Sequence, residues 1–171
     1  MLSAFFQRLD LGVRRFVPLV TVLAFIFLGA VRWPVPYAGA ISPSLGLAAV
    51  YYWSIHRPDL FHPVTAFACG LLYDLINFLP FGLTAIVYIG VHQLVLRQRR
   101  FFAGQTFYVL WAGFALVALL ASAWQWMVVS VYNNLWVPVE PVALQFFLTL
   151  AVFPLPAWLL IRLQRVALSQ G

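Results

Sequence analysis

The sequence predicts an all-α protein: a bundle of six transmembrane helices with both termini on the inner side of the membrane. The chain is 64% hydrophobic and only 8% charged, whereas a soluble globular domain averages about 25% charged residues. Apolar runs recur along the whole chain and are separated by short polar or proline-containing segments. All ten basic residues are arginines, and they gather at the ends of these runs. This combination indicates an integral membrane protein.

The apolar runs give the expected spans in order. A short amphipathic lead-in (1–15) precedes them, and the spans are expected at about 16–31, 41–55, 64–79, 83–96, 107–131 and 142–161. The second to fourth runs are shorter than the ~20 residues of an ideal span, so we expect their ends to extend into the loops. Pro80-Phe81-Gly82 predicts a tight reversal between the third and fourth spans. No loop is long enough for a separate domain, so residues 1–171 are expected to form a single membrane domain.

The arginines predict the orientation of the bundle. With the N-terminus inside, Arg32 alone lies on an outer segment. The inner segments hold Arg8, Arg14, Arg15, Arg57, Arg97, Arg99, Arg100, Arg162 and Arg165. This bias follows the positive-inside rule and predicts that both ends of the chain lie inside.

The first apolar run has a competing interpretation. Basic residues, an apolar stretch and Ala38-Gly39-Ala40 together imitate a cleavable signal peptide. Arg32, Pro34 and Pro36 separate the apolar stretch from that cleavage site, which favours a retained span.

One carboxylate lies inside an apolar run. Asp74 is one of four acidic residues and the only one that no predicted loop adjoins. A charge within a span costs roughly 2.5–3.5 kcal/mol, so it normally faces the interior of a bundle. At ~1.5 Å of rise per residue, Asp74 lies roughly 8 Å below the outer end of the third span, and Tyr88 and Gln125 reach similar depths. We expect these three residues to form one buried polar layer, and the alternative is that Asp74 reaches outer water unaided.

Small residues recur on the same face of the third span. Ala66 and Gly70 precede Asp74 at intervals of four, which places all three on one side of a helix. This spacing lets another backbone approach closely. Ala118 and Ser122 give the fifth span a similar face.

The sequence predicts no enzyme and no cofactor. It contains no P-loop, dinucleotide glycine motif or nucleophile elbow, and a pair between His92 and Asp74 would need tilted helices. His56, Asp59 and His62 imitate a metal site, but two prolines disrupt the helical register there, so a solvated loop is expected. The arginines form no basic arm or face with interleaved polar residues, which argues against nucleic-acid binding despite the +6 net charge.

The order and spacing of several motifs resemble the MreD family in the form found in alphaproteobacteria. They cover about residues 41–127 and are Pro43, Tyr51-Tyr52-Trp53, Arg57-Pro58-Asp59, Gly70-Leu71-Leu72-Tyr73-Asp74, Pro80-Phe81-Gly82-Leu83, the arginines from Arg97 to Arg100, and Gln105–Gln125 with Trp111 and Gly113, followed by Trp126.

The resemblance implies a non-enzymatic membrane scaffold of the cell-elongation (rod) complex in the bacterial inner membrane. Its implied partners are MreC, the MreB filament, RodA with its penicillin-binding transpeptidase, and membrane lipid. It also implies a fold shared with the membrane subunits of energy-coupling-factor transporters, so the alternative function is a subunit that binds a small molecule for vitamin uptake. Under the scaffold hypothesis, the candidate structural or interaction residues are Gly70, Asp74, Pro80, Gly82, Tyr88 and Gln125.

Overall fold

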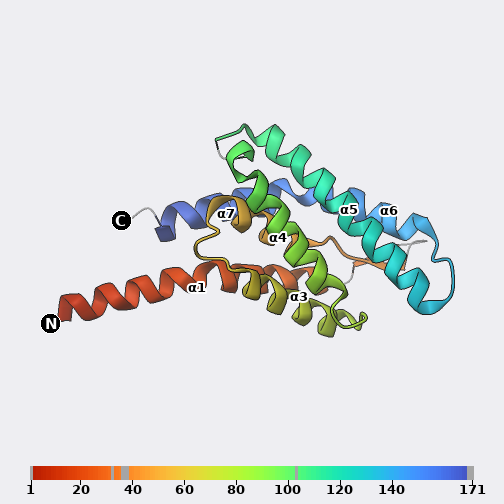
Figure 1. The fold of residues 1–171 in the computed structure, drawn as a ribbon, viewed down its shortest axis with the longest axis horizontal. Helices are drawn as coiled ribbons and strands as arrows, with labels where there is room; N and C mark the ends of the chain where they lie inside the picture. Colours follow the sequence, from red (N-terminus) through yellow and green to blue (C-terminus); the bar gives the residue numbers. More distant parts are fainter. Residues whose placement is uncertain (1, 32, 36–38, 103, 169–171) are drawn as a thin grey trace.

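The structure is a bundle of helices joined by short loops (Figure 1). The computed structural model describes residues 2–31, 33–35, 39–102 and 104–168, with side-chain surroundings for residues 16–31, 41–98, 100–101 and 104–165. The elements are α1 (Leu2–Ala30), β1 (Trp33–Val35), β2 (Gly39–Ile41), α2 (Leu45–His56), α3 (Pro63–Asn77), α4 (Leu83–Phe102), α5 (Phe107–Asn133), α6 (Val139–Val152) and α7 (Pro154–Leu168). The predicted all-α class is confirmed, apart from one short hairpin.

That hairpin lies where the sequence predicted the start of the second span. Strands β1 and β2 pair antiparallel, with Trp33 opposite Ile41. The helix begins only at Leu45, because Pro43 lies in the preceding segment and its carbonyl accepts a bond from the Leu45 N–H at 2.9 Å. Proline disfavours a helical conformation in the residue before it. The helix thus begins four residues after the start of the second apolar run, which the sequence places at about residue 41.

The last predicted span consists of α6 and α7 together. Phe153 links them with helical backbone angles, and its N–H donates to the Thr149 carbonyl at 3.0 Å. Pro154 follows as the first residue of α7. Proline is tolerated in the first turn of a helix because the N–H groups of that turn have no acceptor within the helix. The stretch Val139–Arg165 therefore runs as one apolar unit of 27 residues.

Helix α2 is the core of the bundle. Every residue from Leu45 to Ile55 is buried, and α2 contacts α1, α4, α5 and α7. A helix that is apolar on all sides is stable only when other helices surround it. The aromatic group Tyr51-Tyr52-Trp53 thus packs inside the bundle, while large apolar side chains remain exposed on the outer helices.

Two of the helical units in the described part of the chain are long and apolar enough to cross a membrane. These are α5 and the combined α6–α7 unit, and shorter apolar stretches occur at Phe16–Ala30 and Pro63–Asn77. The start of α1 and the end of α7 lie at one end of the bundle, and the α3–α4 and α5–α6 loops lie at the other (Figure 1). This arrangement separates the segments that the sequence assigns to the two sides. Arg8, Arg14, Arg15, Arg32 and Arg99 are part of that assignment, but their side chains lie outside the described residues.

The orientation can be tested by cysteine labelling in spheroplasts. Phe81 and Tyr132 are 72% and 69% exposed near the end of the bundle opposite the termini. Phe81→Cys and Tyr132→Cys should react with a membrane-impermeant maleimide from outside, because the positive-inside rule places that end outside. Gln98→Cys, exposed near the end of α4, should react only after permeabilisation, and the buried Cys69 should stay unlabelled. The reverse pattern would contradict the predicted orientation.

Candidate functional site

Asp74 caps the N-terminus of a neighbouring helix. Its side chain, on α3, is fully buried. Oδ2 accepts the Gly82 N–H at 3.0 Å and the Thr84 N–H at 3.1 Å, and Oδ1 accepts the Thr84 N–H at 3.0 Å. The first N–H groups of a helix have no partner within the helix and form its positive end. Asp74 therefore supplies to α4 the acceptor and the negative charge that an N-cap residue normally supplies from its own helix.

The main chain of Asp74 also closes α3. Phe78 ends that helix in a left-handed conformation with φ of 54°, and the Leu79 N–H returns to the Asp74 carbonyl at 3.0 Å. This is the bonding pattern of a Schellman C-cap. One residue thus ends α3 through its backbone and begins α4 through its side chain.

Pro80 and Gly82 shape the turn between these two caps. The Pro80 carbonyl accepts the Leu83 N–H at 3.2 Å. Gly82 has φ of +89°, a conformation that L side chains rarely adopt, and it presents its N–H to the carboxylate. The predicted tight reversal at these residues is present.

Gly70 lets α3 and α4 pack closely. Ala66, Gly70 and Asp74 are all buried on α3, which contacts α4. A Cβ added at Gly70 would overlap Ala85 Cα and lie 2.7 Å from the Ala85 nitrogen. The small-residue spacing therefore marks a real backbone contact in this case.

The expected polar layer takes a different form from the one that the sequence suggested. Gln125 Nε2, on α5, donates to Thr84 Oγ1 at 3.4 Å, and the Thr84 N–H bonds to Asp74. Asp74 and Gln125 are therefore linked through Thr84, which the sequence reasoning overlooked. Tyr88 packs its ring 6.3 Å from that of Tyr73, and its buried hydroxyl has no hydrogen-bond partner among the described residues.

The sequence did not predict two further hydrogen bonds between helices. His92 Nδ1 lies 2.8 Å from Ser54 Oγ, which itself donates to the Val50 carbonyl at 2.7 Å. A serine hydroxyl has one proton, so His92 Nδ1 is the donor in this pair. Trp53 Nε1 donates to Thr21 Oγ1 at 2.9 Å and ties α2 to α1. The presence of polar side chains inside apolar runs could have indicated such bonds. Their partners could not be predicted, because they lie 32 and 38 residues away in the sequence.

The histidines of the second inner segment do not gather into a metal site. Among the described residues, no group of three or more His, Cys, Asp or Glu side chains is placed to hold a metal ion. His56 stacks on Tyr52 with ring centroids 4.1 Å apart, and Asp59 pairs with Arg57 at 3.5 Å. The buried carboxylate Asp74 is likewise occupied by backbone donors. The arrangement can hold helices together, and it offers no assembled catalytic set in the described part of the chain.

Comparison with known protein families shows the family of this chain. The family model for the rod shape-determining protein MreD matches residues 12–164 of the 171-residue chain. The chain belongs to the MreD family. The resemblance found in the sequence is thereby confirmed, and this MreD-family chain has a role in rod-shape determination. The family is a membrane-protein family that determines shape and is not a known enzyme family. Searches of curated proteins and of solved structures return no match.

Removing the Asp74 cap should destabilise the bundle in a graded way. Asp74→Asn keeps one acceptor oxygen and should lower the free energy of unfolding by about 1–2 kcal/mol. Asp74→Leu leaves the buried Thr84 N–H and the half-buried Gly82 N–H without their acceptor and should lower it by about 3–5 kcal/mol. Unfolding of the purified protein in detergent measures both values. Asp59→Asn, at an exposed carboxylate, is the matched control and should change little. Equal, small losses for both Asp74 variants would contradict the capping role.

Substitution of Gly70 should separate α3 from α4. Gly70→Leu forces a side chain into the Ala85 backbone and should destabilise the protein by about 1–3 kcal/mol or more. Gly90→Leu, on the adjacent helix, is the control because a Cβ there meets no atom within 4 Å. Thermal unfolding of the two variants compares them directly, and equal midpoints would rule out the close approach.

Proposed function

We propose that this MreD-family protein is a non-enzymatic membrane scaffold of the bacterial cell-elongation complex. In this proposal it spans the inner membrane six times with both ends inside, and it helps to organise sidewall peptidoglycan synthesis. The observation that carries the proposal is the use of the buried polar groups. Asp74, Thr84 and Gln125 are bonded to one another or to the backbone, which suits a rigid support.

The outer faces of the helices support a role in assembly. On α5, Leu116, Leu119, Leu120 and Met127 are between 50% and 58% exposed. Such side chains need an apolar environment, which lipid or a partner helix supplies. Because the loops between helices are short, the single span of MreC would meet these helix sides rather than a folded extramembrane domain.

The inner end of the bundle supports contact with anionic groups. Arg57, Arg97, Arg100, Arg162 and Arg165 lie at or near helix ends on the side of the termini. Arg162 also holds its guanidinium carbon 4.6 Å from the centre of the Trp158 ring. Arginines and tryptophans at this level suit the anionic inner leaflet, and the same charges are available to MreB or other cytoplasmic partners.

RodA and its penicillin-binding transpeptidase complete the proposed set of partners. These enzymes would carry out wall synthesis, while the bundle would keep MreC and the synthases together. The likeness to the membrane subunits of energy-coupling-factor transporters remains a prediction about the fold. It leaves the vitamin-transporter subunit as the alternative function.

Depletion and complementation test the proposal in a rod-shaped bacterium that encodes this chain. Depleted cells should become spherical, and Asp74→Asn should restore rod shape better than Asp74→Leu, because the amide keeps part of the cap. In the same cells, a photo-crosslinker at exposed Leu120 should capture MreC, whereas one at buried Ala118 should not. Normal shape with lost vitamin uptake would instead favour the transporter subunit.

A further inference from the structure

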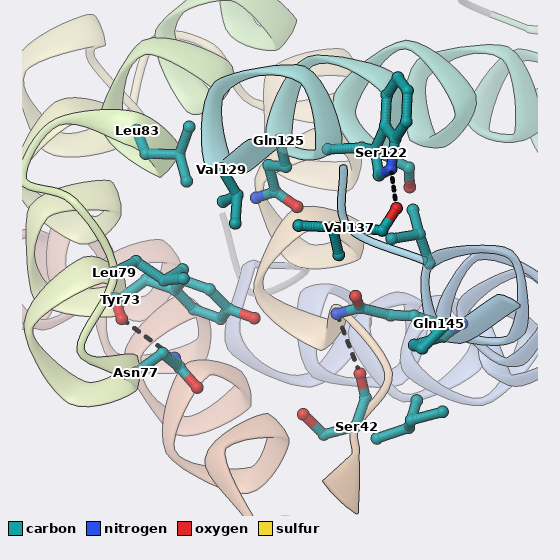
Figure 2. A pocket seen from close by; sticks show the side chains of 14 residues that line it. Ser42, Tyr73, Asn77, Leu79, Leu83, Ser122, Gln125, Val129, Val137 and Gln145 are labelled. Carbon is teal, nitrogen blue, oxygen red and sulfur yellow. Dashed lines mark hydrogen bonds between the residues drawn. The ribbon is translucent and has the colours of Figure 1, made fainter. Parts of the chain in front are cut away.

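A cavity opens at the end of the bundle opposite the termini. It has a volume of about 310 Å³ and lies between the end of α3, the start of α4, α5, α6 and the segment after β2 (Figure 2). Pockets that bind small molecules have volumes from about 300 to 1,000 Å³ and combine apolar walls with a few placed polar groups. This cavity has both features. Asp74 and residues 80–82 of the turn between α3 and α4 lie beside the cavity but do not line it.

Three side-chain amides line the cavity, and each is fixed by a hydrogen bond to the protein. The bonds are Gln125 Nε2 to Thr84 Oγ1 at 3.4 Å, Gln145 Nε2 to the Ser42 carbonyl at 3.2 Å, and Asn77 Nδ2 to the Tyr73 carbonyl at 3.0 Å. Each amide keeps a carbonyl oxygen and a second N–H for another partner. Figure 2 shows Gln125 and Gln145 extending toward the cavity from different helices. The amides are therefore oriented before any ligand arrives.

A smaller chamber adjoins the cavity. The chamber has a volume of about 10 Å³, and it shares Ser122, Gln125 and Gln145 with the cavity. Tyr88 lines it, is 1% exposed, and has no hydrogen-bond partner for its hydroxyl among the described residues. A buried unpaired hydroxyl costs about 1–3 kcal/mol, and a chamber of this size holds about one water molecule. The Tyr88 hydroxyl itself lies beside Gly46, which lines neither the chamber nor the cavity, so it is not available to a ligand there.

The lining also restricts the charge of a ligand. No Arg, Lys, His, Asp or Glu side chain lines the cavity within the described part of the chain. The nearby Asp74 has both oxygens bonded to backbone N–H groups. A charged group buried here would have no partner, which is costly. Leu79, Leu83 and Trp126 provide apolar contact for a carbon skeleton.

We propose that this cavity is a binding site for a small uncharged ligand that carries several hydroxyl or amide groups, such as a sugar or the sugar headgroup of a lipid. The amides of Asn77, Gln125 and Gln145 donate to it and accept from it. The site is independent of the partners proposed above, because it rests on the cavity and its three oriented amides.

Binding can be measured with the full chain in phosphatidylcholine nanodiscs, which lack sugar-headed detergent. Glucose is titrated against tryptophan fluorescence, with Trp126 in the lining as reporter, and glucose 6-phosphate is the matched charged probe. A parallel sample contains monoglucosyl diacylglycerol, with the thermal midpoint as readout. We expect a saturable response to glucose or stabilisation by the glycolipid, and no response to the phosphate. A response to the glycolipid alone identifies a lipid as the source of the sugar group.

Substitutions in the lining test whether the binding response arises from this cavity. The Asn77 amide donates to a carbonyl of its own helix, so Asn77→Leu should keep the fold. Asn77→Leu and Gln145→Leu should each weaken binding about three- to tenfold, the effect of one neutral hydrogen bond. Gln93→Leu, at an exposed amide on α4, should leave binding unchanged. The proposal is overturned by the absence of a saturable response to either sugar probe, by equal binding of glucose 6-phosphate, or by unchanged binding in both cavity variants.

Discussion

The hydrogen bonds between the Asp74 carboxylate and the first N–H groups of α4 are the constraint on which the rest of this structure depends. In a bundle surrounded by lipid, no water satisfies a buried helix end, so an acceptor must come from the protein. A carboxylate suits this position because the helix N-terminus carries a partial positive charge. The ion that seemed costly inside an apolar span is thus paired with the positive end of the neighbouring helix.

The other features of the α3–α4 turn make that interaction possible. The missing side chain at Gly70 lets the two backbones approach. Gly82 adopts the positive φ that the turn requires, and its N–H donates to the carboxylate. The Schellman closure of α3 through the Asp74 carbonyl fixes the residue that bears the cap. The contacts of Gly70, Asp74 and Gly82 therefore all meet at the turn between α3 and α4.

The same rule explains three further hydrogen bonds of buried polar groups. Trp53 bonds to Thr21, Ser54 pairs with His92, and the Ser44 N–H donates to Thr149 Oγ1 at 3.0 Å. Each bond joins α2, or the residue just before it, to a different helix, so polar atoms hold the central helix in register where apolar packing alone is non-directional. The Tyr88 hydroxyl and His92 Nε2 depart from this pattern, because both are buried and neither has a hydrogen-bond partner among the described residues.

The sequence by itself determined the helical class, the membrane character, the family, and the turn at Pro80-Phe81-Gly82. These follow from local properties: composition, the length of apolar runs and the backbone preferences of proline and glycine. It also placed Ala66, Gly70 and Asp74 on one face, because helical periodicity fixes that relation. Only the tertiary structure decided what Asp74 bonds to, that Thr84 stands between Asp74 and Gln125, and that the Tyr88 hydroxyl bonds to neither of them. Those outcomes depend on which helices are neighbours and how they are rotated, and this is set by the packing of residues far apart in the chain.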